Sequence, residues 1–247
     1  MTDEYKKWAL VTGGGKRIGA TIAETLHNKG FNVAIHYNSS CDAADQLCAQ
    51  LNAKQQDSST AIGADLTDQD ALENLIPSLI GKTKRLDVLV NNASTFYPTP
   101  IEKITLEDWE NLLGTNLKAP LFLSKFAAKY LKQSQGIIIN IVDIHSKKPL
   151  KEHPIYGSAK SGLAMLTRSL ATDLAPDIRV NGISPGLILW PESSPSEQVK
   201  NNILQQIPLK KIGNSEDIAN CVLFLIEDAP YITGEIIAVD GGRSMGW

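Results

Sequence analysis

Short apolar runs alternate with longer amphipathic stretches along most of the chain. The runs are apolar almost throughout rather than at every second residue, which is typical of strands buried on both faces of a sheet. Most are bounded by glycine, asparagine or charged residues, which favour turns. The predicted strands are 8–11, 31–35, 60–62, 86–90, 137–142, 179–183 and 236–239.

The stretches between these runs have helical spacing. Gly30 marks the end of the first helix, and Asp68 is a natural N-cap for the third. The predicted helices are 16–28, 42–51, 68–80, 106–131 and 155–170. Strands that alternate with helices indicate βαβ units. We therefore expect an α/β fold, a Rossmann-type doubly wound sheet of about seven parallel strands with helices on both faces, as one domain over residues 1–247.

Composition excludes several functional classes. A hydrophobic content of 43% is enough for a large core, and a net charge of −3 gives no reason to expect a nucleic-acid partner. No apolar run is long enough to cross a membrane, and the polar N-terminus does not resemble a signal peptide. The 3 cysteines form no CxxC pair, so we expect neither disulfides nor a metal. These features predict a soluble cytoplasmic protein.

A glycine-rich turn joins the first predicted strand to the first helix. Residues 12–19 read TGGGKRIG, and Gly13 follows the strand almost directly. Glycines allow a tight turn that approaches a phosphate closely, and the helix N-terminus offers free N–H groups to an anion. The position of the turn indicates a dinucleotide site more strongly than its composition does.

The end of the second predicted strand favours NADPH over NADH. NAD binders commonly place an acid there to hold the ribose, but residues 36–40 read HYNSS. Lys16 and Arg17 add two cations that suit a 2′-phosphate. The alternative is that both are solvated residues at a helix start, which conflicts with the preference for acids at that position.

Tyr156 and Lys160 form a candidate catalytic pair. Residues four apart lie on one face of a helix, and a nearby ammonium is expected to lower the pKa of the phenol. Asp143 precedes Tyr156 and would add a second group that handles protons. Taken alone, the spacing fits an ordinary helix surface equally well.

Together these motifs resemble the short-chain dehydrogenase/reductase family across essentially the whole chain. The matching positions are the turn at 12–19, Asp65, 91–93, Asn116, Tyr156 with Lys160, and 185–186. Arg17 stands where the family has a second glycine, and Asp143 where it has a catalytic serine. Both departures, and the string NNASTFYPTP at 91–100, are similar to the pteridine reductase branch. Ser39 replaces an arginine of that branch, which predicts weaker 2′-phosphate binding.

The resemblance implies reduction of a dihydrobiopterin, dihydromonapterin or dihydrofolate to its tetrahydro form by NADPH. It implies that Asp143, Tyr156, Lys160 and Asn116 are catalytic, with Asn116 holding a water. Ser94, Phe96, Asp143 and Tyr156 would bind the pterin, with Tyr97 and Trp190 as weaker candidates. The implied cofactor contacts are Gly13, Lys16, Arg17, Ile18, His36, Tyr37, Asn38, Ser39, Ser40, Asp65, Leu66, Asn92, Ala93, Ser94, Lys160, Pro185, Gly186 and Leu187.

Other interpretations stay open at this point. A carbonyl reductase, such as a 3-oxoacyl thioester reductase, would use the same fold, although an ionised Asp143 cannot donate a hydrogen bond to a carbonyl. A non-catalytic NADPH-binding sensor would not need Tyr156, Lys160 and Asn116. The helices at 121–130 and 155–170 are apolar over more than one face, which together with the resemblance predicts a homotetramer. The loop at 187–196 is either a lid or a plain surface loop.

Overall fold

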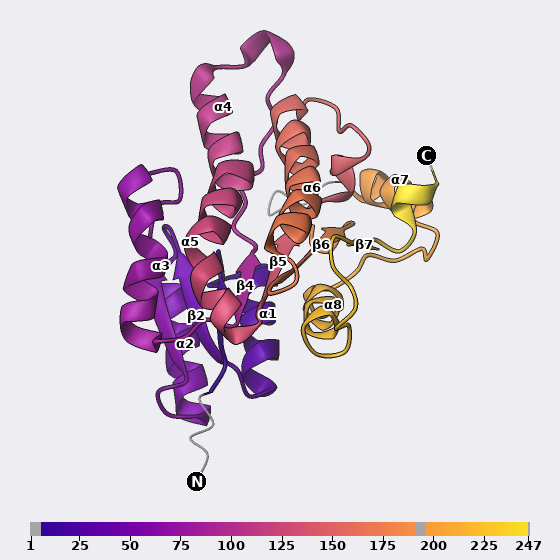
Figure 1. Cartoon of the computed structure of the whole chain (residues 1–247). Coiled ribbons are helices and arrows are strands. Elements are labelled where there is room, and N and C mark those ends of the chain that lie inside the picture. Colours follow the sequence, from indigo (N-terminus) through magenta and orange to yellow (C-terminus); the bar gives the residue numbers. More distant parts are fainter. Residues whose placement is uncertain (1–5, 191–195, 247) are drawn as a thin grey trace.

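Seven parallel strands form the sheet at the centre of the molecule (Figure 1). The computed structural model describes residues 6–190 and 196–246. The strands are β1 (Trp8–Val11), β2 (Asn32–Tyr37), β3 (Ser59–Gly63), β4 (Val88–Asn91), β5 (Ile137–Ile141), β6 (Arg179–Pro185) and β7 (Ile236–Val239). Their order is β3-β2-β1-β4-β5-β6-β7, and every neighbouring pair is parallel. The predicted fold class is confirmed.

The apolar runs form strands because both faces of the sheet are buried. Ala9 and Val11 face one core cluster, whereas Leu10 between them faces the other. The same alternation holds on β4, where Leu89 packs on the opposite side from Val90. Successive side chains of a strand point to opposite faces, so a doubly covered strand must be apolar at every position.

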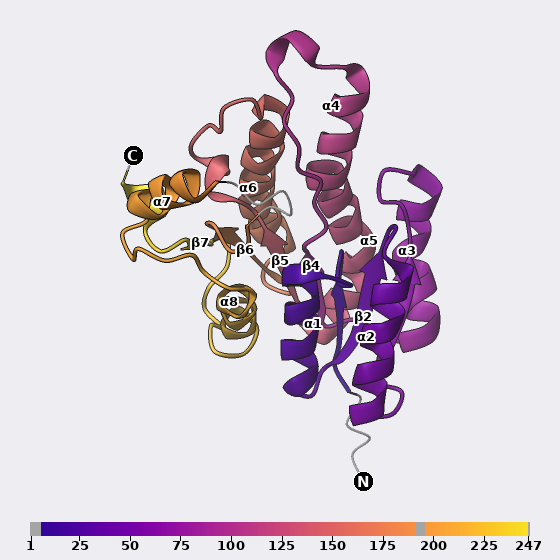
Figure 2. The ribbon, with the colours of Figure 1, turned by 180° about the vertical axis from the view of Figure 1, so that it is seen from behind.

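Helices cover the two faces in separate groups. The described helices are α1 (Arg17–Asn28), α2 (Cys41–Lys54), α3 (Gln69–Thr83), α4 (Leu106–Leu113), α5 (Ala119–Ser134), α6 (Pro154–Leu174), α7 (Glu197–Gln206) and α8 (Ser215–Glu227). Side chains of α1, α2 and α8 pack in one core cluster, and those of α3 and α5 pack in the other. Figure 1 views the side of α3, α5 and α6, and Figure 2 views the molecule from behind.

The predicted helix at 106–131 is interrupted. After α4, residues Gly114–Lys118 form a π-turn, and α5 continues to Ser134. Such widened turns are rare and frequently lie at functional sites. The turn contains Asn116, so the irregularity falls on a predicted site residue.

Two further differences concern β4 and the last two helices, whereas the predicted cap of α3 is confirmed. The predicted strand at 86–90 starts later, at Val88, because the Asp87 carboxylate pairs with Arg85 and accepts the N–H of Trp8. The prediction also missed α7 and α8, although Asn214 and Asp217 form a capping box at the start of α8. Asp68 caps α3 as predicted, accepting the N–H of Ala71 at 2.8 Å.

The loop predicted at 187–196 is only partly described, because residues 191–195 lie outside the described ranges. Within those ranges, none of the helices has the length and apolarity needed to cross a bilayer.

Candidate active site

The predicted site residues gather where the strands end. The glycine-rich turn follows β1, Asn92 follows β4, Asp143 follows β5, and Pro185 ends β6. Because all the strands are parallel, their carboxyl ends meet at one edge of the sheet. In open α/β sheets this edge forms the ligand crevice.

The glycine-rich turn needs glycine at two positions. Gly13 has a φ of +60°, a region that side chains disfavour. A Cβ on Gly19 would lie 2.2 Å from the carbonyl oxygen of Gly13, which no side chain tolerates. Arg17 also has a positive φ, 51°, which explains why glycine suits that position. For an arginine this conformation costs roughly 1 kcal/mol, so a benefit of the guanidinium to the cofactor would account for its presence.

His36 lies behind the turn and does not reach a ligand with its ring. The ring is buried, its Nδ1 accepts the N–H of Gly13 at 3.1 Å, and its Nε2 bonds the carbonyl oxygen of Ala64 at 3.0 Å. Burial lowers its pKa to about 4, so the ring is neutral at neutral pH. The imidazole therefore supports the turn, and any contact from His36 to a cofactor would be made by its backbone.

Thr12 organises the junction between the turn and β4, and the sequence analysis did not single it out. Its Oγ1 accepts the N–H groups of Asn92 at 2.9 Å and Ala93 at 3.0 Å. The side chain of Asn92 returns a bond to the carbonyl oxygen of Thr12 at 2.9 Å. The position of this threonine, directly before the first glycine of the turn, is the feature of the sequence that could have indicated its role. The amide of Asn92 is thus committed to the turn.

The remaining cofactor candidates line the same end of the sheet. Asn38 and Ser39 are exposed after β2, and Tyr37 accepts a bond from the thiol of Cys41 at 3.1 Å. The carboxylate of Asp65 is held by Thr67, whose hydrogen bonds lower its pKa. The side chain of Leu66 is buried in the core. Any contact from Leu66 to an adenine would therefore use its backbone.

Residues at the end of β6 lie at the same edge of the sheet. Gly186 donates to the carbonyl oxygen of Val239 at 3.0 Å, and a Cβ on it would lie 2.6 Å from Cα of Asp240. Ile18 packs partly against the core beneath the turn. In the described ranges, no cluster of acids, histidines and cysteines is suited to a metal.

Asp143, Tyr156 and Lys160 lie together. The phenol of Tyr156 donates to Oδ2 of Asp143 at 2.7 Å, and the main-chain N–H of His145 donates to Oδ1 at 2.7 Å. Lys160 is buried, and its Nζ donates to the carbonyl oxygen of Ile141 at 2.9 Å. The same Nζ is 5.7 Å from the ring centroid of Tyr156.

The electrostatics of Tyr156 differ from the expectation. Its pKa is raised well above the ordinary value, first by burial and then by the charge of Asp143. Lys160 was expected to lower that pKa, but its Nζ is bonded to a carbonyl oxygen rather than to the phenol. Burial lowers the pKa of Lys160 itself to about 8, partly offset by Asp143. The expectation for Tyr156 was wrong, and the phenol keeps its proton at neutral pH.

Asn116 reaches this group through Ser94. Ser94 Oγ donates to Oδ1 of Asn116 at 2.6 Å, and Ser94 lies beside the Tyr156 side chain. The amide nitrogen of Asn116 donates to the carbonyl oxygens of Thr95 and Leu112, both at 2.9 Å. The bond to Leu112 joins the π-turn to the end of α4. Asn116 therefore positions the segment that carries Ser94 and Thr95.

Phe96 provides an open aromatic surface beside the phenol. Its side chain is 55% exposed, and its centroid is 4.8 Å from that of Tyr156, with an interplanar angle of 77°. His153 stacks on it at 4.7 Å and 14°. Exposed aromatic faces of this kind favour flat ligands.

Comparison with known proteins gives three functional names for similar chains. A family model described as Enoyl-(Acyl carrier protein) reductase matches residues 14–244. The chain is 36% identical to Pteridine reductase 1 of Leishmania tarentolae, over 96% of each chain. It is 36% identical to the 3-oxoacyl-[acyl-carrier-protein] reductase FabG of Staphylococcus epidermidis, over 97% of this chain and 99% of the relative. The corresponding Staphylococcus aureus protein is 37% identical. The identities to the pteridine reductase and to the 3-oxoacyl reductases are nearly equal, so they do not distinguish between these two kinds of relative.

Proposed function

Because the chain belongs to the short-chain dehydrogenase/reductase family of NAD(P)-dependent oxidoreductases, we propose that it reduces a dihydropterin to the tetrahydro form with NADPH. The substrate is of the dihydrobiopterin, dihydromonapterin or dihydrofolate type. The hydrogen bond from Tyr156 to Asp143 carries this proposal.

The carboxylate of Asp143 favours a pterin over a carbonyl substrate. A ketone is activated by hydrogen-bond donors around its oxygen, whereas a carboxylate only accepts hydrogen bonds. Asp143 would place negative charge beside that oxygen. A pterin edge carries ring nitrogens and N–H donors, which suit a group that accepts from one atom and relays a proton to another. Phe96 supplies a surface on which such a flat ring stacks.

Tyr156 and Asp143 hold one transferable proton between them. The raised pKa keeps the proton on the phenol at neutral pH, and the 2.7 Å bond links it to the carboxylate. The pair gives this proton to the ring nitrogen of the substrate C=N bond. Lys160, buried nearby, offsets the negative charge that the pair gains. Proton transfer of this kind contributes roughly 10²- to 10⁴-fold.

The residues of the crevice fit NADPH. Gly13 and Gly19 let the turn pack closely, and α1 begins at Arg17 with free N–H groups that suit a phosphate. Lys16 and Arg17 are exposed, and the end of β2 carries no acid. Both features match a 2′-phosphate. The bound cofactor supplies the hydride that adds to the C=N carbon.

One spectrophotometric experiment tests this function. NADPH oxidation is followed with dihydrobiopterin, dihydrofolate and an acetoacetyl thioester in turn. We expect turnover with at least one pterin and a much lower kcat/KM for the thioester. Preference for the thioester would support the second candidate, a 3-oxoacyl thioester reductase, which the similarity to FabG proteins favours. Turnover of none of the three would favour a non-catalytic NADPH-binding role.

We also propose that the protein is a homotetramer. Large apolar side chains are exposed on α4, α5 and α6, including Trp109, Leu121 and Met165. Single exposed apolar residues are ordinary, but their gathering on neighbouring helices is typical of an interface. Light scattering at micromolar concentration tests this assembly, and a monomer mass would contradict it.

A further inference from the structure

One residue, Thr67, joins the loop between β3 and α3 to the π-turn between α4 and α5. Its main-chain N–H and its Oγ1 both donate to Oδ1 of Asp65, at 2.9 Å and 2.7 Å. Its carbonyl oxygen accepts from Nζ of Lys118 at 3.4 Å. A Cβ on Gly114 would lie 3.4 Å from Cγ2 of Thr67, so this methyl group lies directly against the glycine. We call these contacts the Thr67 link.

One end of the Thr67 link lies at the ligand edge of the sheet. Asp65 follows β3 at the carboxyl edge, and it is exposed. Asp65 is also one of the contacts expected for the adenosine of the cofactor. Because Thr67 holds the carboxylate of Asp65 with two hydrogen bonds, a ligand that touches this carboxylate also restrains Thr67.

The other end of the Thr67 link is the π-turn itself. The N–H of Ala119 donates to the carbonyl oxygen of Gly114, which is the i→i+5 bond that characterises a π-turn. The acceptor of this bond is therefore the same residue that the methyl group of Thr67 touches. The first three residues of the turn, Gly114 to Asn116, are buried. A change at Thr67 is thus felt inside the packed structure and not only at its surface.

Asn116 carries the connection from the π-turn to the reacting group. Its amide nitrogen donates to the carbonyl oxygen of Thr95 at 2.9 Å, and its Oδ1 accepts from Ser94 Oγ at 2.6 Å. Ser94 lies beside Tyr156, whose phenol donates to Asp143 at 2.7 Å. Contacts therefore run from the loop after β3, through the π-turn, to the proton-transfer pair.

A π-turn has a discrete alternative arrangement. It holds one residue more than an α-helical turn, and a shift by one residue rotates each side chain by roughly 100° about the helix axis. In the α-helical arrangement the side chain of Asn116 would turn away from Ser94 and lose the bond between them. A contact that favours one of the two arrangements therefore acts on the reacting group.

We propose that Thr67 is a positioning residue that couples the adenosine end of the cofactor site to the reacting group. A ligand on Asp65 holds Thr67 against Gly114, which favours the π-turn and keeps Ser94 beside Tyr156. The inference rests on the proposed pterin reduction. It gives a role in the reaction to the half of the cofactor that carries no hydride.

The first test supplies the cofactor in two pieces. Reduced nicotinamide mononucleotide carries the hydride, and adenosine 2′,5′-bisphosphate occupies only the adenosine end. We expect the bisphosphate to raise kcat/KM for the reduction of dihydrobiopterin by the mononucleotide about 5- to 150-fold, the range of typical coupled sites. In Thr67→Ala this activation should fall about 2- to 30-fold. An activation of equal size in the wild type and in this variant would overturn the inference.

Two further variants sharpen this comparison. Lys118→Met removes the second contact between Thr67 and the π-turn, so it should also lower the activation. Thr172→Val is the matched control, because it removes an exposed threonine hydroxyl that bonds the carbonyl oxygen of Arg168 within α6. It should leave the activation unchanged. Equal losses in Thr172→Val and Thr67→Ala would contradict a specific role of the Thr67 link.

Hydrogen exchange separates this inference from the proposed function, because it needs no turnover. Bound adenosine 2′,5′-bisphosphate should slow amide exchange at 13–19, which reports occupancy, and also at 112–118. In Thr67→Ala and Lys118→Met, the slowing at 13–19 should persist and that at 112–118 should be lost. If no pterin is reduced but this pattern is present, only the proposed function fails. Slowing at 112–118 that persists in both variants, or that is absent from the wild type, contradicts the coupling.

Discussion

Replacing Asp143 by serine removes the group on which the proposed preference for a pterin rests. In the wild type, one carboxylate oxygen accepts from Tyr156 and the other from the N–H of His145, both at 2.7 Å. The shorter serine side chain cannot span both bonds. The variant loses the charge that helps to raise the pKa of Tyr156, and the partner that shares its proton.

The expected loss follows from the role of the pair. A positioned proton donor is worth roughly 10²- to 10⁴-fold, and the tyrosine remains, so we expect the lower end of this range. The kcat for dihydropterin should fall about 10²-fold, which corresponds to about 2.7 kcal/mol. Because Asp143 lies at the reacting end of the crevice, NADPH affinity should change less than about threefold.

Single-turnover kinetics with saturating NADPH measure the chemical step, and quenching of protein fluorescence measures cofactor binding. Asp143→Asn provides the isosteric control. It keeps the shape but has one acceptor oxygen for two donors, so it should also lose most pterin activity. The serine variant should meanwhile gain activity with an acetoacetyl thioester, because a hydroxyl can donate. Pterin turnover within threefold of the wild type in both variants would remove Asp143 from the mechanism.

Four further outcomes are expected. The variant Tyr156→Phe should lose turnover but bind NADPH normally. Activity near that of the wild type would rule out the phenol as the proton donor. Lys160 has a pKa of about 8, so its charge is lost as the pH rises through 8, and kcat should fall above that pH; a flat profile to pH 9.5 would contradict this. The pKa of His36 is lowered from 6.5 to about 4, so the unfolded state binds more protons than the folded state between these pH values. The free energy of unfolding should therefore decline by up to roughly 3 kcal/mol as the pH falls from 6.5 to 4. Urea melts of His36→Gln should show a smaller decline. Arg17→Gly should raise the free energy of unfolding by roughly 1 kcal/mol, because φ is 51° at this position. The same variant should weaken the binding of NADPH far more than that of NADH. Equal effects on the two cofactors would refute the contact of Arg17 with the 2′-phosphate.

Local patterns in the sequence were sufficient for the fold. Strands covered on both faces must be apolar throughout, and βαβ units can only build a parallel sheet, so the run at 8–11 and its six counterparts determined the architecture. The carboxyl ends of parallel strands meet at one edge, and this places Gly13 and Asp143 at the same edge without any knowledge of side-chain geometry.

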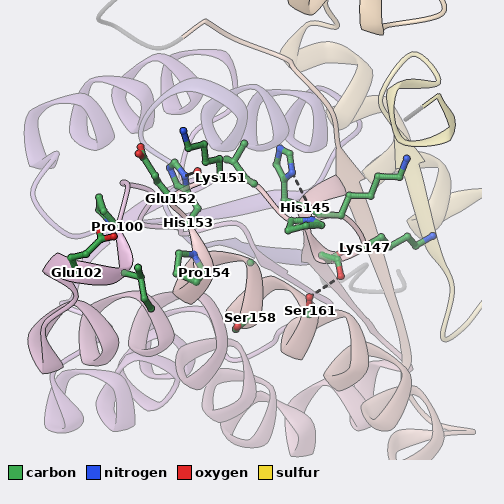
Figure 3. A pocket seen from close by; sticks show the side chains of 16 residues that line it. Pro100, Glu102, His145, Lys147, Lys151, Glu152, His153, Pro154, Ser158 and Ser161 are labelled. Carbon is green, nitrogen blue, oxygen red and sulfur yellow. Dashed lines mark hydrogen bonds between the residues drawn. The ribbon is translucent and has the colours of Figure 1, made fainter.

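Tertiary structure alone decided how the site groups behave. The helical spacing of Tyr156 and Lys160 correctly predicts proximity, but the phenol's pKa depends on burial and on Asp143, which no spacing encodes. His36 and Asn116 are polar residues near motifs, yet their bonding partners come from segments distant in the chain. The pocket lined by residues 100–102, residues 145–154 and the first turns of α6 likewise exists only because these segments pack together (Figure 3). Backbone pattern is a local property, whereas electrostatics and cavities depend on contacts between segments remote in sequence, and those are specified only by the complete fold.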